Sequence, residues 1–455
     1  MSTINKKRQL GRPVSIVGAG LSQFGAFADK DCRDLFVEAF QDMVQSMDRG
    51  FDIQDIECAY VGNYSSDLFE HQGHTAPIVA DWLGITPIPI TRIENACASS
   101  GSALREGVMA IASGMYDVVL VGGMEKMTNL ATDGVTDVLA SAADGLYEVP
   151  AGLTFPGIFG AIAKAHMDKY ETNLDHLLKV AIKNHSNGAL NPKAQFQQTM
   201  TQMAERRMAR AQERGQMVPD YKSDLDFLHD EAANPWIAWP LRLYDCAPIT
   251  DGASCVLLVS EEIANNFTDI PISIAGIGQA TGKPLHDSDE LTSLSAAKAA
   301  SQQAYDMSGI TVADVDLAEV HDCFTIAEIV ATEDLGFFAP GEGARAVDDG
   351  RTALDGDHPV NTSGGLKAKG HPVGASGVGQ VIEIYHQLRG EAGERQVKKT
   401  DPTVGITHNV VRYIDMPRVL DKVAYKTLMS TGELRQMVSE GHLGKKSGRG
   451  FHDWS

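Results

Sequence analysis

The sequence predicts an α/β protein built from two similar halves, and three observations support this fold class. Short β-rich runs alternate with longer helical patterns, as in parallel sheets covered by helices. A Gly- and Ser-rich turn precedes a helix twice, at NACASSGSAL (95–104) and at GHPVGASGVG (370–379). The alternation lapses over residues 124–244, which are polar and partly charged. Because a structureless loop of that length is uncommon, we expect an inserted domain or lid there.

The elements follow one another in the same order in both halves. In the first half the patterns predict strands at 13–17, 58–62, 88–93 and 117–122, with helices at 33–47 and 99–113. In the second half they predict strands at 271–277, 317–320 and 403–409, with helices at 294–307 and 375–388. We therefore expect an N-terminal half (1–123 and 245–268), the inserted segment (124–244), a C-terminal half (269–412) and an extension (413–455).

Composition excludes several classes of protein. The formal net charge of −21 argues against a nucleic-acid binder, which would present clustered Lys and Arg to phosphates. No run of about 20 apolar residues predicts a membrane span, and no apolar segment follows the basic N-terminus. The six cysteines have no repeating spacing and no CxxC pair, so we expect free thiols in the cytoplasm and no metal site.

Cys97 is the first candidate catalytic residue, because it follows an apolar strand and directly precedes a helix. A helix N-terminus presents unpaired N–H groups and partial positive charge, which should lower the pKa of this thiol. The alternative is a buried structural cysteine. Small neighbours, Ala96, Ala98 and Gly101 among them, favour a nucleophile, since they leave room for a covalent acyl group.

His371 is the second candidate, in an irregular Gly-rich turn before the last long helix (NTSGGLKAKGHPVGASGVG, 361–379). A lone histidine is usually a surface or core residue, but glycines on both sides of this one indicate a shaped cavity. We expect His371 to take the proton of Cys97.

HDCF (321–324) supplies two further candidates. It follows a predicted strand, so His321 and Cys323 should lie at the carboxyl end of the sheet, on the same side of the chain. A polar loop with one buried cysteine is the alternative. His408 and Asn409 end the last predicted strand and are candidates for the same cavity.

These segments together resemble the thiolases, in particular the sterol-carrier-protein-type branch. NHSNGALNPKAQF (184–196) and LYDCAPITDGASCVLL (243–258) add to the resemblance, which covers about residues 12–412. It implies a five-layered α-β-α-β-α sandwich, a homodimer or dimer of dimers, and an inserted loop domain that binds coenzyme A (CoA). It also implies CoA and acyl-CoA as substrates, no permanently bound cofactor and, in some members, a small zinc-ribbon and OB-fold partner protein.

The resemblance also implies roles for the candidate residues. Cys97 matches the acylated nucleophile, and His371 matches its base. Other thiolases carry a second catalytic cysteine in a C-terminal CxG motif, where this chain has ITHNVVRYI (406–414), so Cys323 would take the acid/base role. His321 and His371 would form one oxyanion hole, and backbone N–H groups near Cys97 and Gly377 a second.

A polyanionic substrate needs a local basic patch in a protein of this charge. Arginines at helical spacing (206, 207, 210 and 214) fall in the inserted segment, so Arg206 and Arg210 are candidate CoA contacts, as are Lys183 and Lys193. An exposed, salt-bridged helix is the alternative.

The expected activity is cleavage of a 3-ketoacyl-CoA by CoA, or the reverse condensation, with an aromatic or branched acyl group among the candidates. Two other functions stay open at this point. One is a condensing enzyme of the ketoacyl-synthase or hydroxymethylglutaryl-CoA-synthase type, and the other is a non-catalytic thiolase-like scaffold. The four residues Cys97, His321, Cys323 and His371 together favour the thiolase.

Overall fold

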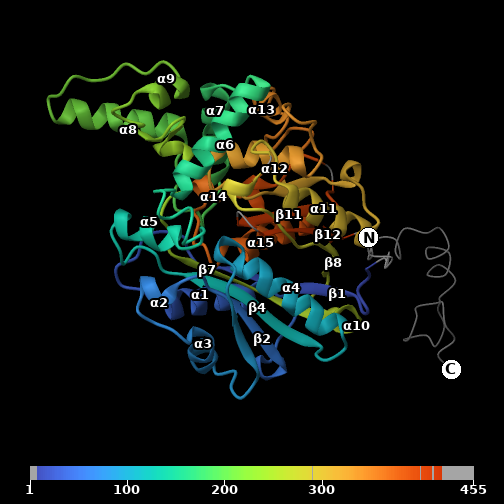
Figure 1. Cartoon of the computed structure of the whole chain (residues 1–455). Helices are drawn as coiled ribbons and strands as arrows, with labels where there is room; N and C mark the ends of the chain where they lie inside the picture. Colours follow the sequence, from blue (N-terminus) through green and yellow to red (C-terminus); the bar gives the residue numbers. More distant parts are fainter. Residues whose placement is uncertain (1–7, 289, 400, 412–413, 423–455) are drawn as a thin grey trace, which may run out of the picture.

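The computed structural model describes residues 8–288, 290–399, 401–411 and 414–422, and shows two α/β halves stacked on each other (Figure 1). The strands of the N-terminal half lie in the order β1-β7-β4-β2-β3. Their bounds are Val14–Leu21 (β1), Cys58–Gly62 (β2), Ile90–Ile93 (β3), Val118–Glu125 (β4) and Gly252–Ser260 (β7). Strands β2, β3 and β4 are parallel, whereas β7 runs antiparallel to both β4 and β1.

The C-terminal half repeats this plan with the order β8-β12-β11-β10. Its strands are Ile272–Ile277 (β8), Leu317–Glu319 (β10), Val404–Val411 (β11) and Ile414–Asp421 (β12), and the short β9 (Ala280–Thr281) pairs with β12. Strand β10 is parallel to β11 and bridges Val360 in parallel, as β2 is parallel to β4 and β3. A short pairing between β1 and β8 joins the two halves into one sheet.

Helices form three layers around the two sheet halves (Figure 1). Helices α4 (Ser99–Ala112) and α15 (Ser376–Arg389) pack on each other in the middle layer. Helices α1 (Cys32–Gln45) and α3 (Thr75–Leu83) cover the outer face of the first half, and α11 (Ser295–Ser308) and α12 (Thr325–Asp334) cover that of the second. The predicted five-layered sandwich is confirmed.

Strand β4 shows why a continuous apolar run becomes a central strand. Val119 and Val121 belong to the core that faces α4 and α15, whereas Val118 and Leu120 belong to the core that faces α1. A strand buried on both faces has no polar positions to alternate with, hence the sequence VVLV. The equivalent helices α4 and α15 therefore meet inside the molecule, and their N-termini carry Cys97 and His371.

The segment between β4 and β7 contributes no strand to the central sheet, and residues 126–251 are all described. Its helices are α5 (Thr132–Ala140), α6 (Phe155–Tyr170), α7 (Leu174–Gly188), α8 (Met200–Glu213) and α9 (Asp224–His229), followed by the hairpin of β5 (Trp236–Ala238) and β6 (Leu241–Arg242). Helices α6 and α7 pack on α12, while α8 and α9 project from the molecule at the upper left of Figure 1. The segment predicted as an insertion, 124–244, thus lies between two strands that are neighbours in the central sheet.

The predicted boundary at residue 412 needs correction. Strand β12 lies beyond it, pairs with β11 and β8, and completes the second half as far as Asp421. Most of the predicted extension, residues 423–455, lies outside the described residues.

Short helices complete the fold at Ser66–Phe69 (α2), Glu261–Ala264 (α10), Gly343–Asp348 (α13) and Gly365–Ala368 (α14). Among the described helices, none has the length and hydrophobicity needed to cross a bilayer.

Candidate active site

A tight turn presents Cys97 at the start of α4. A short 3-10 turn (Ala96–Ala98) directly precedes the helix, and Ala96 has a positive φ of 42°. The hydroxyl of Ser99 donates to the Ala96 carbonyl at 2.6 Å and accepts the N–H of Asn95 at 2.9 Å. A non-glycine residue in this backbone region is strained and persists only when its surroundings hold it there, which is common at functional sites.

The prediction of a lowered pKa for Cys97 is wrong for the protein without substrate. Burial and, to a smaller extent, the Glu125 carboxyl raise the pKa of this thiol to about 12, although a backbone N–H acts in the opposite direction. Only 9% of the residue is exposed, so desolvation of the charged form outweighs the helix N-terminus. Cys97 is therefore a neutral thiol at rest and needs a base to attack.

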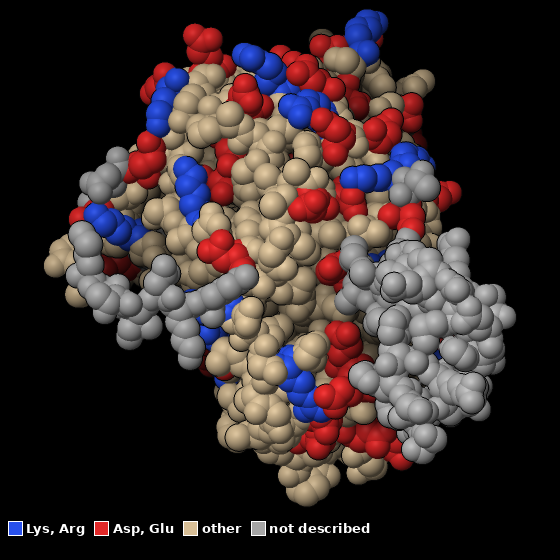
Figure 2. Space-filling model, turned by 90° about the vertical axis from the view of Figure 1, so that its right-hand side faces the viewer, with Lys and Arg blue, Asp and Glu red and all other residues tan. Residues whose placement is uncertain are grey.

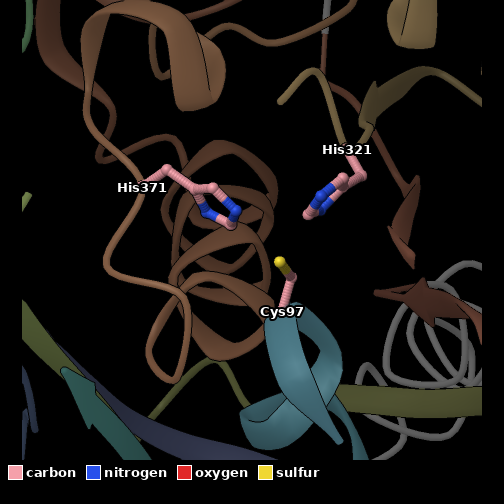
Figure 3. A group of neighbouring side chains, drawn as sticks. All are labelled: Cys97, His321 and His371. Carbon is pink, nitrogen blue, oxygen red and sulfur yellow. The ribbon is translucent and has the colours of Figure 1, made fainter. Parts of the chain in front are cut away.

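Two histidines flank the sulfur (Figure 3). The Sγ of Cys97 and a ring nitrogen each of His321 and His371 lie within 4.8 Å of one another. The two rings are nearly perpendicular, at 83°, with centroids 5.0 Å apart. All three residues and Cys323 line one cavity of about 90 Å³, whose other walls are mostly apolar: Met127, Leu139, Phe155, Phe159, Ala247, Pro248, Ile249, Phe324, Val373 and Val410.

The hydrogen bonds of His371 prepare it as a base. Its Nδ1 lies 2.7 Å from the hydroxyl of Ser376, which itself donates to the carbonyl of Pro372 at 2.9 Å. The Ser376 oxygen therefore accepts from Nδ1–H, and the lone pair of Nε2 stays available. Nε2 is buried and has no hydrogen-bond partner among the described residues. Burial and the nearby Lys369 lower the pKa of His371 to about 3, so the ring is neutral and can accept a proton.

His321 has the complementary tautomer. The side-chain amide of Asn409 donates to Nδ1 of His321 at 3.1 Å, which leaves the hydrogen of this ring on Nε2. Burial, His371 and His408 lower the pKa of His321 well below its usual value. His321 is therefore a neutral N–H donor beside Cys97, as an oxyanion hole requires.

Cys323 faces the same cavity from the HDCF loop, as predicted. The residue is 8% exposed, and its carbonyl accepts the N–H of Ala247 at 2.9 Å, which ties the loop to the end of the inserted segment. Burial raises the pKa of the Cys323 thiol well above its usual value, and Cys97 raises it further. Two thiols and two neutral imidazoles thus share one small, mostly apolar space.

Three other candidates lie elsewhere than the sequence suggested. Asn409 stands behind His321 and His408 beside it, and neither belongs to the cavity lining. Gly377 is also outside the lining; a Cβ at this position would lie 2.6 Å from both the Gly101 nitrogen and the Asn409 amide oxygen. The structure therefore gives Gly377 a packing role, because α15 and α4 approach each other closely there.

The candidate CoA contacts separate into two groups. Lys183 pairs with Glu328 at 2.8 Å and is 10% exposed, and Lys193 donates to the Leu21 carbonyl at 2.8 Å and pairs with Asp42 at 3.0 Å. Both lysines are thus held by internal partners, and Lys183 is too buried to meet a surface ligand. The arginines differ. Those at positions 206, 207, 210 and 214 line one surface groove of about 490 Å³, here called the arginine groove, with Phe196, Phe227 and Tyr244 among its walls.

The thiol and two imidazoles have the donor types of a zinc site, but the tautomers fit another chemistry. A metal ligand needs a lone pair, and Nε2 of His321 carries a hydrogen when Asn409 donates to Nδ1. An acceptor nitrogen and a donor nitrogen on either side of a thiol are suited to nucleophilic acyl chemistry instead.

Sequence reasoning missed Ser376 and Asn409 as the residues that set the two tautomers. Ser376 lies five residues after His371, at the first position of α15, a spacing that brings its hydroxyl back to the ring. Asn409 was predicted as a candidate for the cavity lining, but no local signal links it to His321, 88 positions earlier.

Fold and site together define a class of protein, one with two stacked α/β halves and a thiol between two neutral histidines where the halves meet. Two family models match the chain, "Thiolase, N-terminal domain" over residues 14–262 and "Thiolase C-terminal domain-like" over residues 278–419. The chain belongs to the thiolase family.

Individual relatives agree with this assignment. An acetyl-CoA acetyltransferase of Methanothermobacter thermautotrophicus is 43% identical over 400 residues, which cover 88% of this chain and 96% of that protein. Human sterol carrier protein 2 is 32% identical over 419 residues, 88% of this chain and 70% of that protein. The predicted resemblance to the sterol-carrier-protein-type branch is confirmed.

Solved structures show the same fold. An Ltp2-ChsH2(DUF35) aldolase has a TM-score of 0.73 at 23% identity, covering 91% of this chain and 98% of that one. Human mitochondrial 3-ketoacyl-CoA thiolase in complex with CoA has a TM-score of 0.61 at 18% identity, covering 91% and 99%.

Proposed function

We propose that this chain is an acyltransferase that cleaves a 3-ketoacyl-CoA with CoA, or forms it by the reverse condensation, through an acyl group on Cys97. One observation carries the proposal: Cys97, Cys323, an acceptor imidazole and a donor imidazole line a single cavity. Relatives named acetyl-CoA acetyltransferases support the acyl-transfer class.

In the first half-reaction the proton of the Cys97 thiol passes to Nε2 of His371. The sulfur attacks the 3-keto carbon, and the oxygen that becomes negative accepts from the N–H of His321. Because the site is buried, these dipoles act with little screening by water. The bond between the second and third carbons then breaks, which leaves an acyl group on Cys97.

The electron pair of the broken bond remains on the α-carbon of the departing acetyl-CoA. We assign the proton for this carbon to the thiol of Cys323, the second thiol of the cavity. An incoming CoA thiol then attacks the acyl-Cys97 thioester and returns a proton to Cys323. The same residues in reverse order perform the condensation.

The position of the arginine groove supports a path for CoA. Tyr244 lines this groove, and Ala247 lines the cavity of Cys97. Three residues of chain span at most about 10 Å, so the groove and the cavity are close enough for one extended ligand. We propose that the groove holds the phosphates of CoA and directs its thiol toward Cys97. Figure 2 shows acidic and basic side chains interspersed over one face of the molecule, whereas four arginines line the groove.

The size of the cavity favours a short acyl group. Its volume of about 90 Å³ is small beside the roughly 300–1,000 Å³ of pockets that enclose drug-sized ligands. Phe155, Phe159 and Phe324 are among its walls and take up space that a bulky acyl group would need. We therefore propose acetoacetyl-CoA as substrate, ahead of the aromatic and branched compounds. A thiolysis panel of ketoacyl-CoAs of increasing bulk tests this, and faster turnover of an aromatic member would contradict it.

A partner protein is a further proposal. The similar Ltp2-ChsH2(DUF35) aldolase includes a DUF35 protein in its name, and the resemblance predicted a small zinc-ribbon and OB-fold partner. Copurification of this chain with such a protein, followed by mass determination of the complex, tests the proposal, and the free chain's mass gives its own oligomeric state.

The decisive experiment for the function is mass spectrometry after acetyl-CoA treatment. We expect one acetyl increment, on the peptide that contains Cys97, and none in the Cys97→Ala variant. Turnover of acetoacetyl-CoA with free CoA then separates a thiolase from a condensing enzyme. A chain without the increment would agree with the scaffold and not with an acyltransferase.

A further inference from the structure

One buried lysine has no role in the steps above. Lys367 lies in α14, is 1% exposed, and its Nζ makes no hydrogen bond to any described residue. An ammonium group taken out of water without a partner is costly, so buried lysines are normally paired. A buried cation without a resting partner suits a site where an anion forms only during the reaction.

The neighbours of Lys367 restrict which anion this could be. Its backbone N–H donates to Asp322, the neighbour of Cys323 in HDCF, at 3.3 Å, which places α14 against this loop. The ammonium group interacts electrostatically with the thiols of Cys246 and Cys323 and with the carboxyl groups of Asp245 and Asp322. Both carboxyl groups are already held by hydrogen bonds from other residues. Asp245 accepts hydrogen bonds from Thr325 and the Arg242 nitrogen, and Asp322 accepts them from Asn184 and the Leu366 nitrogen. His185, on α7, also lies in the field of Lys367, but burial keeps this ring neutral by lowering its pKa to about 3.

Of the two thiols, only one belongs to the reaction cavity. Cys246 is outside the lining, and its sulfur donates to the Arg242 carbonyl at 3.3 Å. Cys323 lines the cavity with Cys97, and its sulfur loses and regains a proton in the carbon–carbon step proposed above. The Cys323 thiolate, which forms only during the reaction, is therefore the anion that Lys367 is placed to meet.

We propose that Lys367 is a positioning residue whose ammonium group stabilises the Cys323 thiolate during the carbon–carbon step, an inference that rests on the acid/base role proposed for Cys323. In cleavage the bond pair passes to the α-carbon, the Cys323 S–H gives its proton to that carbon, and the sulfur becomes an anion facing Lys367. The incoming CoA thiol restores the proton. Atoms and charge balance without an oxidant or cofactor.

The electrostatics of Cys323 agree with this geometry. Burial, Cys97 and Asp322 all raise the pKa of the thiol, whereas the Phe324 backbone N–H and Lys367 lower it. His321 and His371, which share the cavity, are neutral because burial lowers the pKa of each ring. The charge of Lys367 thus makes the deprotonation of Cys323 easier.

The first test measures the thiol directly, without substrate. In a Cys97→Ser chain, alkylation of Cys323 by iodoacetamide is followed by peptide mass spectrometry between about pH 6 and pH 10. We expect Lys367→Met to shift the profile up by about one pH unit or more, which is about a tenfold slower reaction at a fixed pH below the midpoint. The matched control is Lys369→Met, because Lys369 is equally buried but pairs with Glu319 at 3.6 Å. An unchanged profile in folded Lys367→Met, or an equal shift in Lys369→Met, overturns the proposal.

A second test keeps Lys367 and changes its partner. Cys323→Asp places a carboxylate where the thiolate forms, and Cys323→Asn is its neutral isostere. We expect the Asp variant to be at least as stable as the Asn variant at about pH 8, because Lys367 pairs with the carboxylate. If thermal unfolding instead shows the Asp variant to be less stable, with a gap that widens as pH rises, the proposal is wrong. Neither test uses acyl-CoA, so a failure of the proposed function, seen as missing acylation of Cys97, is distinguishable from a failure here.

Discussion

The Ser376 hydroxyl lies 2.7 Å from Nδ1 of His371, and this single contact decides which nitrogen of the ring can act as a base. The hydroxyl proton is engaged by the Pro372 carbonyl at 2.9 Å, so the serine can only accept from the ring. Nε2 keeps its lone pair in consequence, and a ring nitrogen of His371 lies within 4.8 Å of the Cys97 sulfur. Ser376 is also the first residue of α15, so the start of this helix fixes the position of the hydroxyl that orients the ring.

Ser376→Ala is therefore expected to slow the acylation of Cys97 while the fold is retained. Without an acceptor at Nδ1, the ring can adopt the other tautomer or turn. We expect a loss of about tenfold to a hundredfold, part of the 10²–10⁴ that a positioned base contributes. The measurement is the rate of acetyl transfer from acetyl-CoA to Cys97. Ser254→Ala is a matched control, since this buried hydroxyl donates to the Ala375 carbonyl at 2.7 Å without touching His371. Equal losses in the two variants would mean that only packing is affected.

The rate of acylation should not fall near pH 6.5, as it would if an ordinary histidine were the base. Burial lowers the pKa of His371 to about 3, so Nε2 remains unprotonated as the pH falls through 6.5. Base function is lost only when the pH approaches the lowered pKa. The Cys97 thiol, with a pKa near 12, does not ionise by itself below about pH 9. We expect an acylation rate nearly constant between about pH 5 and pH 8.5. A limb centred near 6.5 would show that His371 is solvated in the working enzyme.

Asn409 is expected to act through His321. Replacing Asn409 by Leu removes the donor to Nδ1, so the Nε2–H that faces the cavity is no longer enforced. We expect kcat to fall by about tenfold to a hundredfold with little change in KM, because the oxyanion exists only after attack. His321→Ala should cost more, about 10²–10³, the usual effect of losing an oxyanion donor. Normal kcat in Asn409→Leu beside a slow His321→Ala would exclude the tautomer argument.

The arginine groove is expected to set the affinity for CoA and not the rate of the chemistry. Arg206→Ala and Arg210→Ala should each raise KM for CoA severalfold, and together by about tenfold, with kcat nearly unchanged. With dephospho-CoA, which lacks the 3′-phosphate, the same substitutions should raise KM by a smaller factor. Lys222→Ala is a charge-matched control in the same segment, because Lys222 pairs with Asp220 at 2.6 Å outside the groove lining. An equal KM effect in this control would indicate general screening only.

Much of the fold could be predicted from the sequence because its signals are local. The run VVLV at 118–121 has no polar position, which marks a strand covered on both faces. The Gly-rich turns before α4 and α15 mark the two helix starts that bring Cys97 and His371 together. Strand β12 was missed because its sequence contains Pro417 and charged residues, and its register depends on both β11 and β8.

The site was harder to predict where pairs of distant residues decide its chemistry. The pKa of Cys97 was expected to fall because the helix start is visible in sequence, whereas the burial that raises it is not. The sequence predicts Lys183 as a surface cation, whereas the structure pairs it at 2.8 Å with Glu328, which lies on a different helix. Composition cannot show which lysines already have partners.

Cys323 offers the sharpest separation of the two half-reactions. Acylation of Cys97 by acetyl-CoA needs the nucleophile, its base and an oxyanion donor, and none of these is Cys323. Cys323→Ala should therefore still acquire the acetyl group at close to the normal rate. Cleavage and condensation should both fall by about two to four orders of magnitude, the usual contribution of a positioned proton-transfer group. Single-turnover experiments that follow acetyl-Cys97 and ketoacyl-CoA separately measure the two steps.

Cys323 is the only described thiol that shares the cavity with Cys97, since Cys32, Cys58 and Cys255 lie in other parts of the core and Cys246 is outside the lining. No other cysteine of the chain can therefore replace it. Cys246→Ala serves as the control and should leave both steps unchanged. If Cys323→Ala slowed both steps equally, the loss would reflect a distorted cavity; if it slowed neither, the proton of the α-carbon would have to come from a histidine or from water. A loss confined to the carbon–carbon step would identify the sulfur of HDCF as the acid/base that this chain uses in place of a C-terminal cysteine.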